Sequence, residues 1–164
     1  MKKWINLGLG LFVLAGIAIS ILLYFSIQPY KDKEELAFSA ALEKSSLKTA
    51  EEFDWFRYKE EYFIVTGKNQ AGEETIVWMD AENLTVVAEY QASEGISKEE
   101  VLQSFQDEWD ISEVIDIKLG YADKRPLWEL TFIDKNNRYT FLQVSFLTGD
   151  WIRYYQYSQG GVSS

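Results

Sequence analysis

Residues 127–156, LWELTFIDKNNRYTFLQVSFLTGDWIRYYQ, alternate apolar and polar side chains in short runs that turn residues separate. Such alternation with a period of two predicts β-strands with one buried face. A shift of 65 residues, without a gap, lays residues 62–91 over this stretch, so that Thr75 falls on Thr140. Because the apolar and turn pattern matches along the whole overlay, the sequence predicts two copies of one structural module.

A helical pattern precedes the strands in each copy. Residues 34–44 place Leu and Ala at helical spacing, and Ser97 is a good N-cap for a second helix with Glu99 and Glu100 in its first turn. Each module is therefore expected to be one helix packed across an antiparallel sheet, which is an α+β fold. The expected strands cover 53–58, 62–66, 75–80 and 85–90 in the first module (30–91), and 114–121, 127–133, 138–146 and 150–157 in the second (95–158), before a flexible tail at 159–164.

A hydrophobic segment occupies the N-terminus of the chain. Lys2 and Lys3 are followed by an uncharged run of 24 residues, 4–27. As a helix this run would rise roughly 36 Å, at about 1.5 Å per residue, which is enough to cross a hydrocarbon core of about 30 Å. A cleaved signal peptide would have a shorter apolar region. We therefore predict a transmembrane anchor at 4–27 that is not cleaved.

The charges around this segment predict its orientation. By the positive-inside rule, Lys2 and Lys3 keep residues 1–3 in the cytoplasm, so the C-terminal part of this single-pass protein should lie outside the cell membrane. The chain has a net charge of −10, and without these two lysines the remainder carries −12. This acidic balance argues against the binding of nucleic acid, and bulk electrostatics also disfavours anionic wall polymers and lipid headgroups.

The composition excludes several kinds of chemistry. The 164 residues include no His and no Cys. The chain therefore has no thiolate nucleophile, no Ser-His-Asp triad and no zinc site built from Cys or His. No Gly-rich phosphate loop is present, and Asp134-x-Asn136 lacks the rest of a calcium loop. The sequence predicts neither a metal nor a cofactor.

The remaining catalytic candidates have simpler explanations. Ser45-x-x-Lys48 matches the nucleophile motif of penicillin-binding proteins and β-lactamases. With 13 Ser and 12 Lys in the chain, about one such pair is expected by chance, and no Ser-Asp-Asn or Lys-Thr-Gly motif follows. Adjacent glutamates make poor acid–base pairs, because neighbours in a strand point to opposite faces. Four such pairs, 51–52, 60–61, 73–74 and 99–100, are expected in turns, linkers or helix starts. We therefore predict that the protein is not an enzyme.

Two segments carry a resemblance to a known family. They are Phe53-Asp54-Trp55-Phe56 and Tyr62-Phe63-Ile64-Val65-Thr66-Gly67-Lys68. Together with the anchor and the two modules, these family-like segments resemble the TseB (YpmB) family, which consists of single-pass proteins of Gram-positive rods with two small cystatin-like domains. The resemblance implies a membrane-anchored regulator of cell wall elongation that acts with a class B penicillin-binding protein, a transpeptidase.

The second module is also similar to PepSY domains. Residues 134–137, DKNN, correspond to their strand turn, and residues 147–150, LTGD, correspond to their Thr-Gly hairpin. The first module departs from this pattern, with Asn83-Leu84 where Thr-Gly would stand. The likeness leaves open an alternative function, an inhibitor or chaperone of a secreted peptidase, and a wall hydrolase is a third class.

Aromatic side chains mark a candidate surface for partner binding. In the last two strands, Leu142, Val144, Phe146, Ile152 and Tyr154 are assigned to the helix-covered core. The opposite face is expected to carry Phe141, Gln143, Trp151, Arg153, Tyr155 and Tyr157. The uncovered face of the first module is expected to carry Ile76, Trp78, Val86 and Tyr90.

Faces rich in Trp, Tyr and Arg have the composition of protein-binding patches. The candidate partner-binding residues are Phe141, Trp151, Arg153, Tyr155, Tyr157 and Trp78. The alternative is that the two open faces pack on each other or on linker residues.

We expect the anchor to leave the acidic part of the chain outside the cell. Protease added to intact, wall-stripped cells should then degrade this part, because no membrane separates it from the enzyme. The loss is measured with an antibody against the C-terminal part, and a cytoplasmic protein that stays intact is the control. Full protection until lysis would contradict this topology.

Overall fold

The computed structural model describes residues 16–17, 28–106 and 108–158 of the chain. They belong to two compact units, of which the second, Ala37–Ser164, contains every strand described below. The predicted tail at 159–164, and all of the predicted anchor at 4–27 except residues 16 and 17, lie outside the described residues. Within the described ranges, no helix is both long and apolar enough to cross a membrane.

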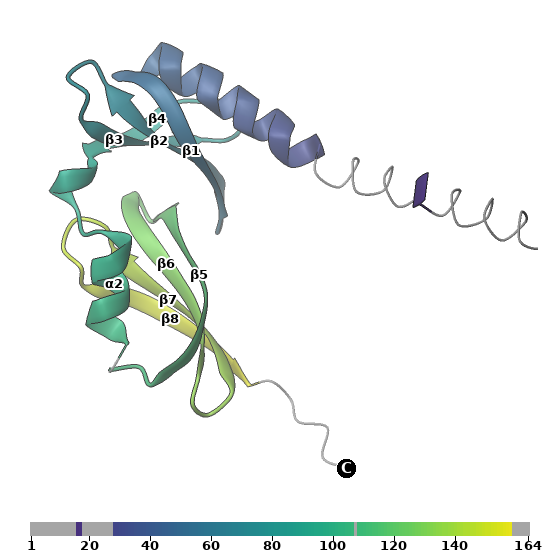
Figure 1. Cartoon of the computed structure of the whole chain (residues 1–164), viewed down its shortest axis with the longest axis vertical. Coiled ribbons are helices and arrows are strands. Elements are labelled where there is room, and N and C mark those ends of the chain that lie inside the picture. Colours follow the sequence, from purple (N-terminus) through teal and green to yellow (C-terminus); the bar gives the residue numbers. More distant parts are fainter. Residues whose placement is uncertain (1–15, 18–27, 107, 159–164) are drawn as a thin grey trace, which may run out of the picture. The chain divides into compact units, whose positions relative to one another are not determined.

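The first four strands form an antiparallel sheet in the order β1-β2-β3-β4 (Figure 1). They span Leu47–Arg57, Glu61–Asn69, Glu74–Asp80 and Val86–Gln91, and a helix at 28–44 precedes them. The small side chains of Ala37, Ala40 and Ala41 are buried in one cluster with Phe63 and Val65 of β2. Alanine both favours the helix and lets it lie close to the sheet, so this face of the sheet is covered.

β2 is buried on both faces, which explains why its sequence is apolar almost without interruption. Phe63 and Val65 belong to the helix-covered cluster, whereas Tyr62 and Ile64 belong to a second cluster on the opposite face. Side chains of a strand alternate between the two faces, so neighbours in the sequence enter different clusters. The second family-like segment therefore lies between two hydrophobic clusters.

The structure separates the residues of the Ser45-x-x-Lys48 motif and corrects the expected position of Glu51-Glu52. β1 begins at Leu47, so Lys48 is a strand residue and does not share a helix with Ser45. Ser45 instead follows the helix, with its Oγ donating to the carbonyl oxygen of Ala41 at 2.7 Å. The pair Glu51-Glu52 also lies on β1 rather than in a linker. The charged residues interrupt the apolar alternation that identifies a strand, so the sequence pattern did not predict this part of β1. It lies at an exposed edge of the sheet, and its pairing with β2 has two irregularities.

A turn of 3-10 helix, η1 (Ala92–Glu94), leads from the first sheet to the helix α2 (Lys98–Phe105). The predicted N-cap is confirmed, because Ser97 Oγ accepts a hydrogen bond from the backbone N–H of Glu100 at 3.2 Å. In return, Glu100 Oε2 accepts from the backbone N–H of Ser97 at 2.7 Å. This capping box satisfies two donors that the first turn of a helix leaves free.

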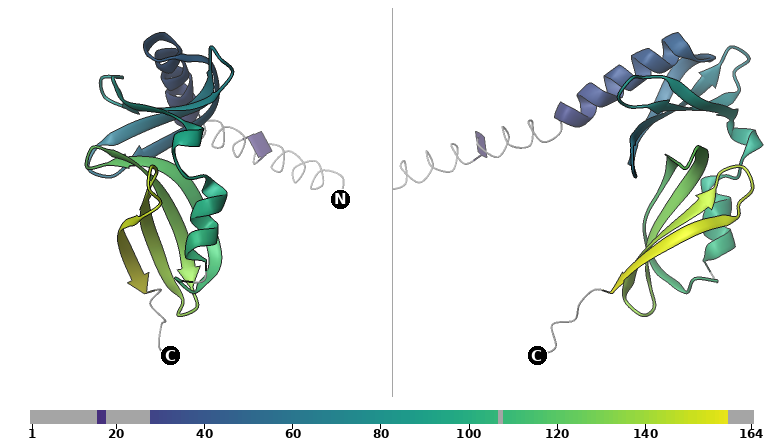
Figure 2. Two further views of the ribbon diagram at one scale, coloured as in Figure 1. Left: turned by 90° about the vertical axis from the view of Figure 1, so that its left-hand side faces the viewer. Right: turned by 180° about the vertical axis from the view of Figure 1, so that it is seen from behind.

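The second sheet is also antiparallel, in the order β5-β6-β7-β8. Its strands span Ile111–Ala122, Arg125–Asp134, Arg138–Ser145 and Trp151–Ser158. Helix α2 covers one face of this sheet (Figure 2), where Val101 and Phe105 of the helix share a core with Leu130, Leu142 and Val144. The two four-stranded antiparallel sheets confirm the predicted α+β class.

The two sheets share this second hydrophobic cluster. The face of the first sheet that its helix leaves uncovered packs against the β5–β6 end of the second sheet. Trp78 of β3 is fully buried there, with its Nε1 donating to the carbonyl oxygen of Gly120 at 3.0 Å and its ring 5.3 Å from that of Phe146. The rings of Tyr62 and Tyr121 lie 4.8 Å apart in the same contact. The prediction of Trp78 as a partner-binding residue is therefore wrong, because its side chain is an internal contact.

Gly120 allows the two sheets to approach each other closely. A Cβ atom at this position would lie 2.7 Å from the ring of Phe56 and 2.9 Å from a methyl group of Leu127. Both distances are shorter than the separation of non-bonded carbon atoms in a packed core. A larger residue at position 120 would therefore push Phe56 and Leu127 away. Phe56 ends the first family-like segment, which therefore contributes directly to the contact between the sheets.

Asp54 of the same segment lies where β1 runs beside β5. Burial raises the pKa of the Asp54 carboxyl, although the backbone N–H of Leu119 donates a hydrogen bond to it. The nearby carboxylate of Asp116 raises this pKa further by repulsion. The ionised form of Asp54 is therefore less favourable in the folded chain than in water.

For Asp134, the last residue of β6, the effects on the carboxyl pKa have the opposite net result. Burial acts to raise the pKa of its carboxyl, but its Oδ2 accepts a hydrogen bond from Arg138 Nε at 2.7 Å. Its Oδ1 also accepts from the backbone N–H groups of Asn136 and Arg138, each at 2.9 Å. These donors hold the pKa of Asp134 below its usual range.

Replacing Trp78 by Ala should lower the free energy of unfolding by about 3–5 kcal/mol, because the change removes a large ring from the shared core. Trp151→Ala is the matched control. The side chain of Trp151 is 53% exposed, so its loss should cost less than about 1.5 kcal/mol. Urea unfolding of the two variants measures both values. Equal losses would contradict the burial of Trp78 between the sheets.

At pH 7, Asp54→Asn should raise the free energy of unfolding. A raised pKa means that the folded chain holds the Asp54 proton more tightly than the unfolded chain does. Stability is therefore lost as the pH rises from the unfolded value of about 3.9 through the folded pKa, and Asn avoids this loss. The difference from the parent should vanish in acid, where both states are protonated.

Asp134→Asn serves as the control, because it should lower stability at pH 7. A depressed folded pKa gives stabilisation that is present above about pH 3.9 and is lost as the pH falls through the folded value. Urea unfolding of the parent and both variants at pH 7 and in acid measures the two effects. If Asp54→Asn had a lower free energy of unfolding than the parent at pH 7, the raised pKa of Asp54 would be contradicted.

Candidate protein-binding surface

The second sheet has an open face on the side away from α2. Phe141 pairs with Tyr155 and Tyr139 pairs with Tyr157 across β7 and β8, so all four rings project from this side. The ring centroids of Tyr139 and Phe141 lie 5.4 Å apart, and those of Phe141 and Tyr157 lie 6.3 Å apart. Tyr155 is 38% exposed and Tyr157 is 62% exposed. We call these four residues the aromatic face.

Trp151 does not belong to the aromatic face, which corrects its predicted position. The register shifts at the start of β8, where Val144 pairs with Trp151 but Gln143 pairs with Arg153. This bulge inserts one extra residue and interrupts the alternation of side chains along β8. Arg153 therefore lies on the open side with Gln143, whereas Trp151 lies on the α2 side with Val144. The ring of Trp151 accordingly lies 6.3 Å from that of Tyr154, which faces α2.

Two further side chains differ in exposure from the predicted pattern. Gln143 lies on the open side but is only 1% exposed, with its Nε2 donating to Glu129 Oε2 at 3.0 Å. Tyr154 was assigned to the core, yet it is 47% exposed. Since β8 is the edge of the sheet, its side chains have a neighbouring strand on one side only. The core assignment is confirmed for the buried Leu142, Val144 and Phe146 and for the half-buried Ile152.

Arg153 contacts the first sheet rather than solvent alone. Its Nη1 donates to the hydroxyl oxygen of Tyr58 at 2.8 Å, and its guanidinium carbon lies 4.9 Å from the centroid of the Tyr58 ring. Its Nη2 forms an ion pair with Asp123, whose other oxygen lies 3.4 Å from Lys59 Nζ. The hydroxyls of Tyr58 and Tyr155 are also hydrogen-bonded, at 3.1 Å. Arg153 therefore connects β8 with the β1–β2 and β5–β6 turns.

The charge of Asp123 is stabilised by this network. The hydrogen bond from Arg153 is the main cause that lowers the pKa of the Asp123 carboxyl. Asp123 and the next residue, Lys124, both have positive φ, of 49° and 62°, in the two-residue turn between β5 and β6. Both central residues of a type I′ hairpin turn adopt such angles, usually as Asn-Gly. The tight turn positions the Asp123 carboxylate beside the end of the first sheet.

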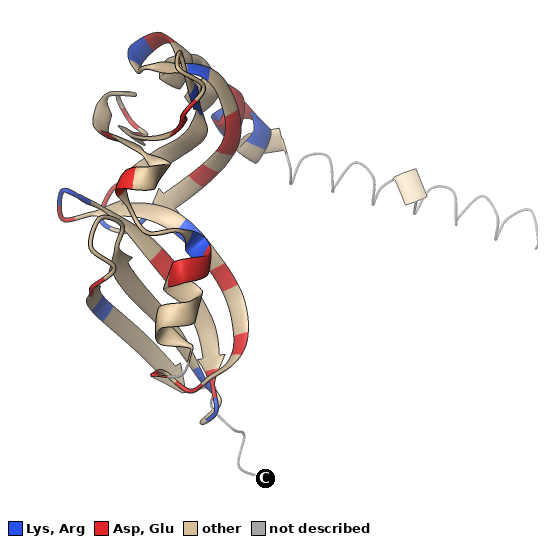
Figure 3. Cartoon of the chain, turned by 60° about the vertical axis from the view of Figure 1, so that its left-hand side comes forward, with Lys and Arg blue, Asp and Glu red and all other residues tan. Residues whose placement is uncertain are grey.

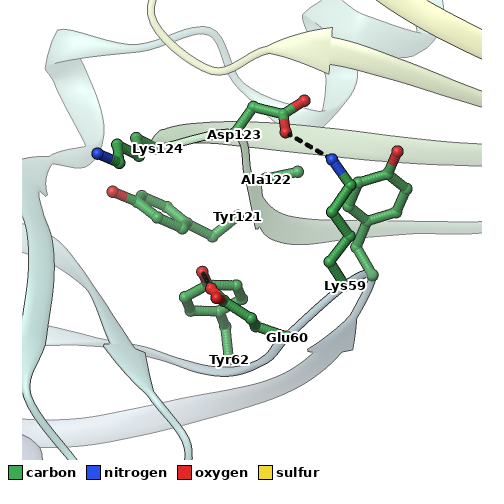
Figure 4. A pocket seen from close by; sticks show the side chains of 8 residues that line it. Lys59, Glu60, Tyr62, Tyr121, Ala122, Asp123 and Lys124 are labelled. Carbon is green, nitrogen blue, oxygen red and sulfur yellow. Dashed lines mark hydrogen bonds and ion pairs between the residues drawn. The ribbon is translucent and has the colours of Figure 1, made fainter.

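A small pocket of about 200 Å³ opens beside this network (Figure 4). The hydroxyl of Tyr62 donates to the carboxylate of Glu60 at its rim, and burial raises the pKa of this hydroxyl, so it stays protonated. Figure 4 shows Asp123 directed toward Lys59. Sites for complete small molecules are larger, about 300–1,000 Å³. The lining residues are Tyr58, Lys59, Glu60, Tyr62, Tyr121, Ala122, Asp123 and Lys124.

The sequence pattern did not identify every residue of this surface. Tyr139 follows the same alternation as Phe141 and could have been included with it. Tyr58 and Asp123 reach the surface only through the packing of the two sheets, for which the sequence carries no local signal. Among the described residues, no group of three or more carboxylates could hold a metal ion.

Comparison with known proteins identifies related chains. Residues 37–80 match the family described as "Cell wall elongation regulator TseB-like domain". A protein of Bacillus subtilis (strain 168), named "Probable cell wall elongation regulator TseB", is 29% identical over 141 residues, which cover 85% of this chain and 88% of that protein. A solved structure, "YpmB protein from Bacillus subtilis", is 28% identical, covers 73% of this chain and 94% of its own, and superposes with a TM-score of 0.68.

The matched range 37–80 runs from the end of the first helix through β3 and includes both family-like segments. The structural match covers most of the chain, so the likeness extends beyond this range to the fold. These findings confirm the resemblance predicted from the sequence: residues 37–80 match a cell wall elongation regulator TseB-like domain, and the chain is similar to Bacillus subtilis TseB over most of its length.

Proposed function

We propose that this protein is a non-catalytic, membrane-anchored regulator of cell wall elongation that binds a class B penicillin-binding protein outside the cell membrane. The role in elongation follows the name of its Bacillus subtilis relative. The binding role is supported by one observation above all, the exposed aromatic face on the second sheet.

The aromatic face has the composition of a binding hot spot. Tyrosine provides a large, rigid contact area with few rotatable bonds, so its immobilisation on a partner costs little entropy. Tyr157 and Tyr155 leave 62% and 38% of their surface accessible. Covering this apolar area would contribute about 25 cal/mol for each Å² removed from water. A folded partner can cover several neighbouring rings at once.

The surroundings of the aromatic face favour a rigid binding surface. Tyr155 is held by the hydroxyl of Tyr58, and Arg153 beside it is held by both Tyr58 and Asp123. These bonds join the edge strand β8 to the first sheet. Side chains that are fixed before binding lose less freedom on association, which increases the affinity that a given contact area provides.

The charged groups beside the pocket support a role in binding rather than in catalysis. Glu60 accepts a hydrogen bond from the hydroxyl of Tyr62, and Asp123 is paired with Arg153 and Lys59. A general acid–base pair needs carboxyls whose pKa values are separated by their environment and whose atoms can reach a substrate. The pKa of Asp123 is lowered by its partners, so this carboxyl is poorly suited to donate a proton.

Location and charge restrict the class of partner. The anchor proposed at 4–27 would hold the domain beside the membrane, where transpeptidases of wall elongation work. Residues 28–164 carry a net charge of −12, so anionic polymers are repelled within the Debye length of about 8 Å. A protein surface that covers aromatic rings is a better match to this domain than an anionic glycan or lipid.

Tyr157→Ala should weaken binding of the transpeptidase about 30-fold, the effect of losing a hot spot of about 2 kcal/mol. The measurement is a titration of the full chain in detergent with the extracytoplasmic part of the class B penicillin-binding protein from the same organism. The free energy of unfolding should stay within about 1 kcal/mol of the parent, because the Tyr157 side chain is largely exposed.

Val87→Ala is the control, since Val87 is a 38% exposed apolar residue on β4, outside the aromatic face. Its affinity should equal that of the parent. In cells, Tyr157→Ala should change cell length in the same direction as deletion of the gene. Equal affinities for the two variants would remove the aromatic face from the proposed interaction.

A further inference from the structure

We infer that β8 receives an extended segment of the partner as a fifth strand of the second sheet. This inference rests on the proposed function, because it states how the partner is bound. β8 spans Trp151–Ser158 and is the last strand of its sheet (Figure 2). Within the part of the chain that the structure describes, β7 is the one strand that pairs with it.

Alternate backbone groups of β8 point away from β7. The N–H of Ser145 at the end of β7 points toward β8 and donates to the carbonyl oxygen of Asp150 at 2.8 Å. Backbone direction alternates along a strand, so the pair of Gln143 with Arg153 also exchanges hydrogen bonds. The residues between such pairs, Tyr154, Gln156 and Ser158, therefore direct N–H and C=O outward. An extended peptide has the complementary row of donors and acceptors.

Other sheet edges carry more protection than β8 does. Native edges are commonly blunted by charged side chains and by bulges. β1 has five charged residues among 11 and β5 has three among 12, each with two irregularities in pairing. β8 has one irregularity, the bulge at its start, and one charged residue among eight, Arg153, whose guanidinium is paired with Asp123. Figure 3 shows the contrast between the charged β1 and β5 and the nearly uncharged β8. The remaining edge strand, β4, is shorter, with six residues.

Aromatic rings flank the free edge on both sides of the sheet. Tyr155 and Tyr157 project on the open side, and Tyr154 projects on the α2 side. The Tyr154 ring lies 4.9 Å from that of Trp109 and 6.3 Å from that of Trp151. A strand added beside β8 would direct alternate side chains toward these two sets of rings. The backbone would then provide affinity and the rings would select apolar side chains.

Charge favours a segment of another protein over a second copy of this chain. Residues 28–164 carry a net charge of −12, so two copies held edge to edge would repel each other. The same charge attracts a segment that carries Lys or Arg. We therefore assign to β8 an extended apolar segment of the transpeptidase that basic residues flank.

The test replaces Gln156 by Pro, which removes an outward N–H that β7 does not use. Gln156→Ala is the matched control, because both changes remove the side-chain hydrogen bond from Gln156 Nε2 to Thr140 Oγ1. The full chain is titrated with the extracytoplasmic part of the class B penicillin-binding protein. Gln156→Pro should weaken binding at least about tenfold relative to Gln156→Ala, which should stay within about threefold of the parent.

Thermal melts establish whether the variants fold. If Gln156→Pro melts far below Gln156→Ala, the change is moved to Ser158 at the end of β8, as Ser158→Pro with Ser158→Ala as its control. Equal binding by folded Pro and Ala variants would overturn the inference and leave the proposed function intact. A parent chain that does not bind the transpeptidase would overturn both. If Gln156→Pro instead abolished self-association of the parent, the edge would belong to a second copy, and the inference would be wrong.

Discussion

The contact between Trp78 and Gly120 is the constraint on which the arrangement of the two sheets depends. The indole ring needs both an apolar cavity and an acceptor for its N–H, because a buried donor without a partner is costly. The carbonyl oxygen of Gly120 supplies the acceptor, and the missing side chain of Gly120 leaves the space that Phe56 occupies. The two repeated copies therefore do not behave as independent modules. They share one core to which each contributes apolar side chains.

This constraint also determines where the candidate binding surface lies. Once the open face of the first sheet is buried, the open face of the second sheet is the one that remains for a partner. The β1–β2 turn then lies near β8, so Tyr58 can bond both Arg153 and Tyr155. The first sheet thus stabilises the edge strand β8: its core contact positions the β1–β2 turn, from which Tyr58 bonds Arg153 and Tyr155.

Local patterns of the sequence predicted much of this fold, and non-local pairing accounts for what they missed. The alternation of apolar residues identified the strands, and Ser97 with Glu100 identified the start of α2. The position of Trp151 was missed because a bulge depends on the register with β7, which one strand alone does not reveal. The links from Arg153 to Tyr58 and Asp123 join residues far apart in the chain. They follow from the packing of two sheets, and no short pattern encodes them.

The overlay of the two copies explains why one open face is buried and the other is not. With the shift of 65 residues, Ile64, Trp78 and Ala88 fall on Glu129, Gln143 and Arg153. Each set forms one row across three strands of its sheet. The row is apolar in the first copy, whereas the second copy has two charged groups and an amide. If the two open faces were packed together, the charges of Glu129 and Arg153 would lie beside indole and aliphatic groups, which offer no partner for a buried charge.

The first copy therefore gives its open face to the core, while the polar row of the second copy forms its own hydrogen bonds and ion pair, Gln143 with Glu129 and Arg153 with Tyr58 and Asp123. In the adjacent row of the second copy, Phe141 pairs with Tyr155, and Tyr155 is 38% exposed. A single exchanged row across three strands thus distinguishes the two copies of one fold: the row of the first copy is buried in the shared core, and the row of the second copy is polar.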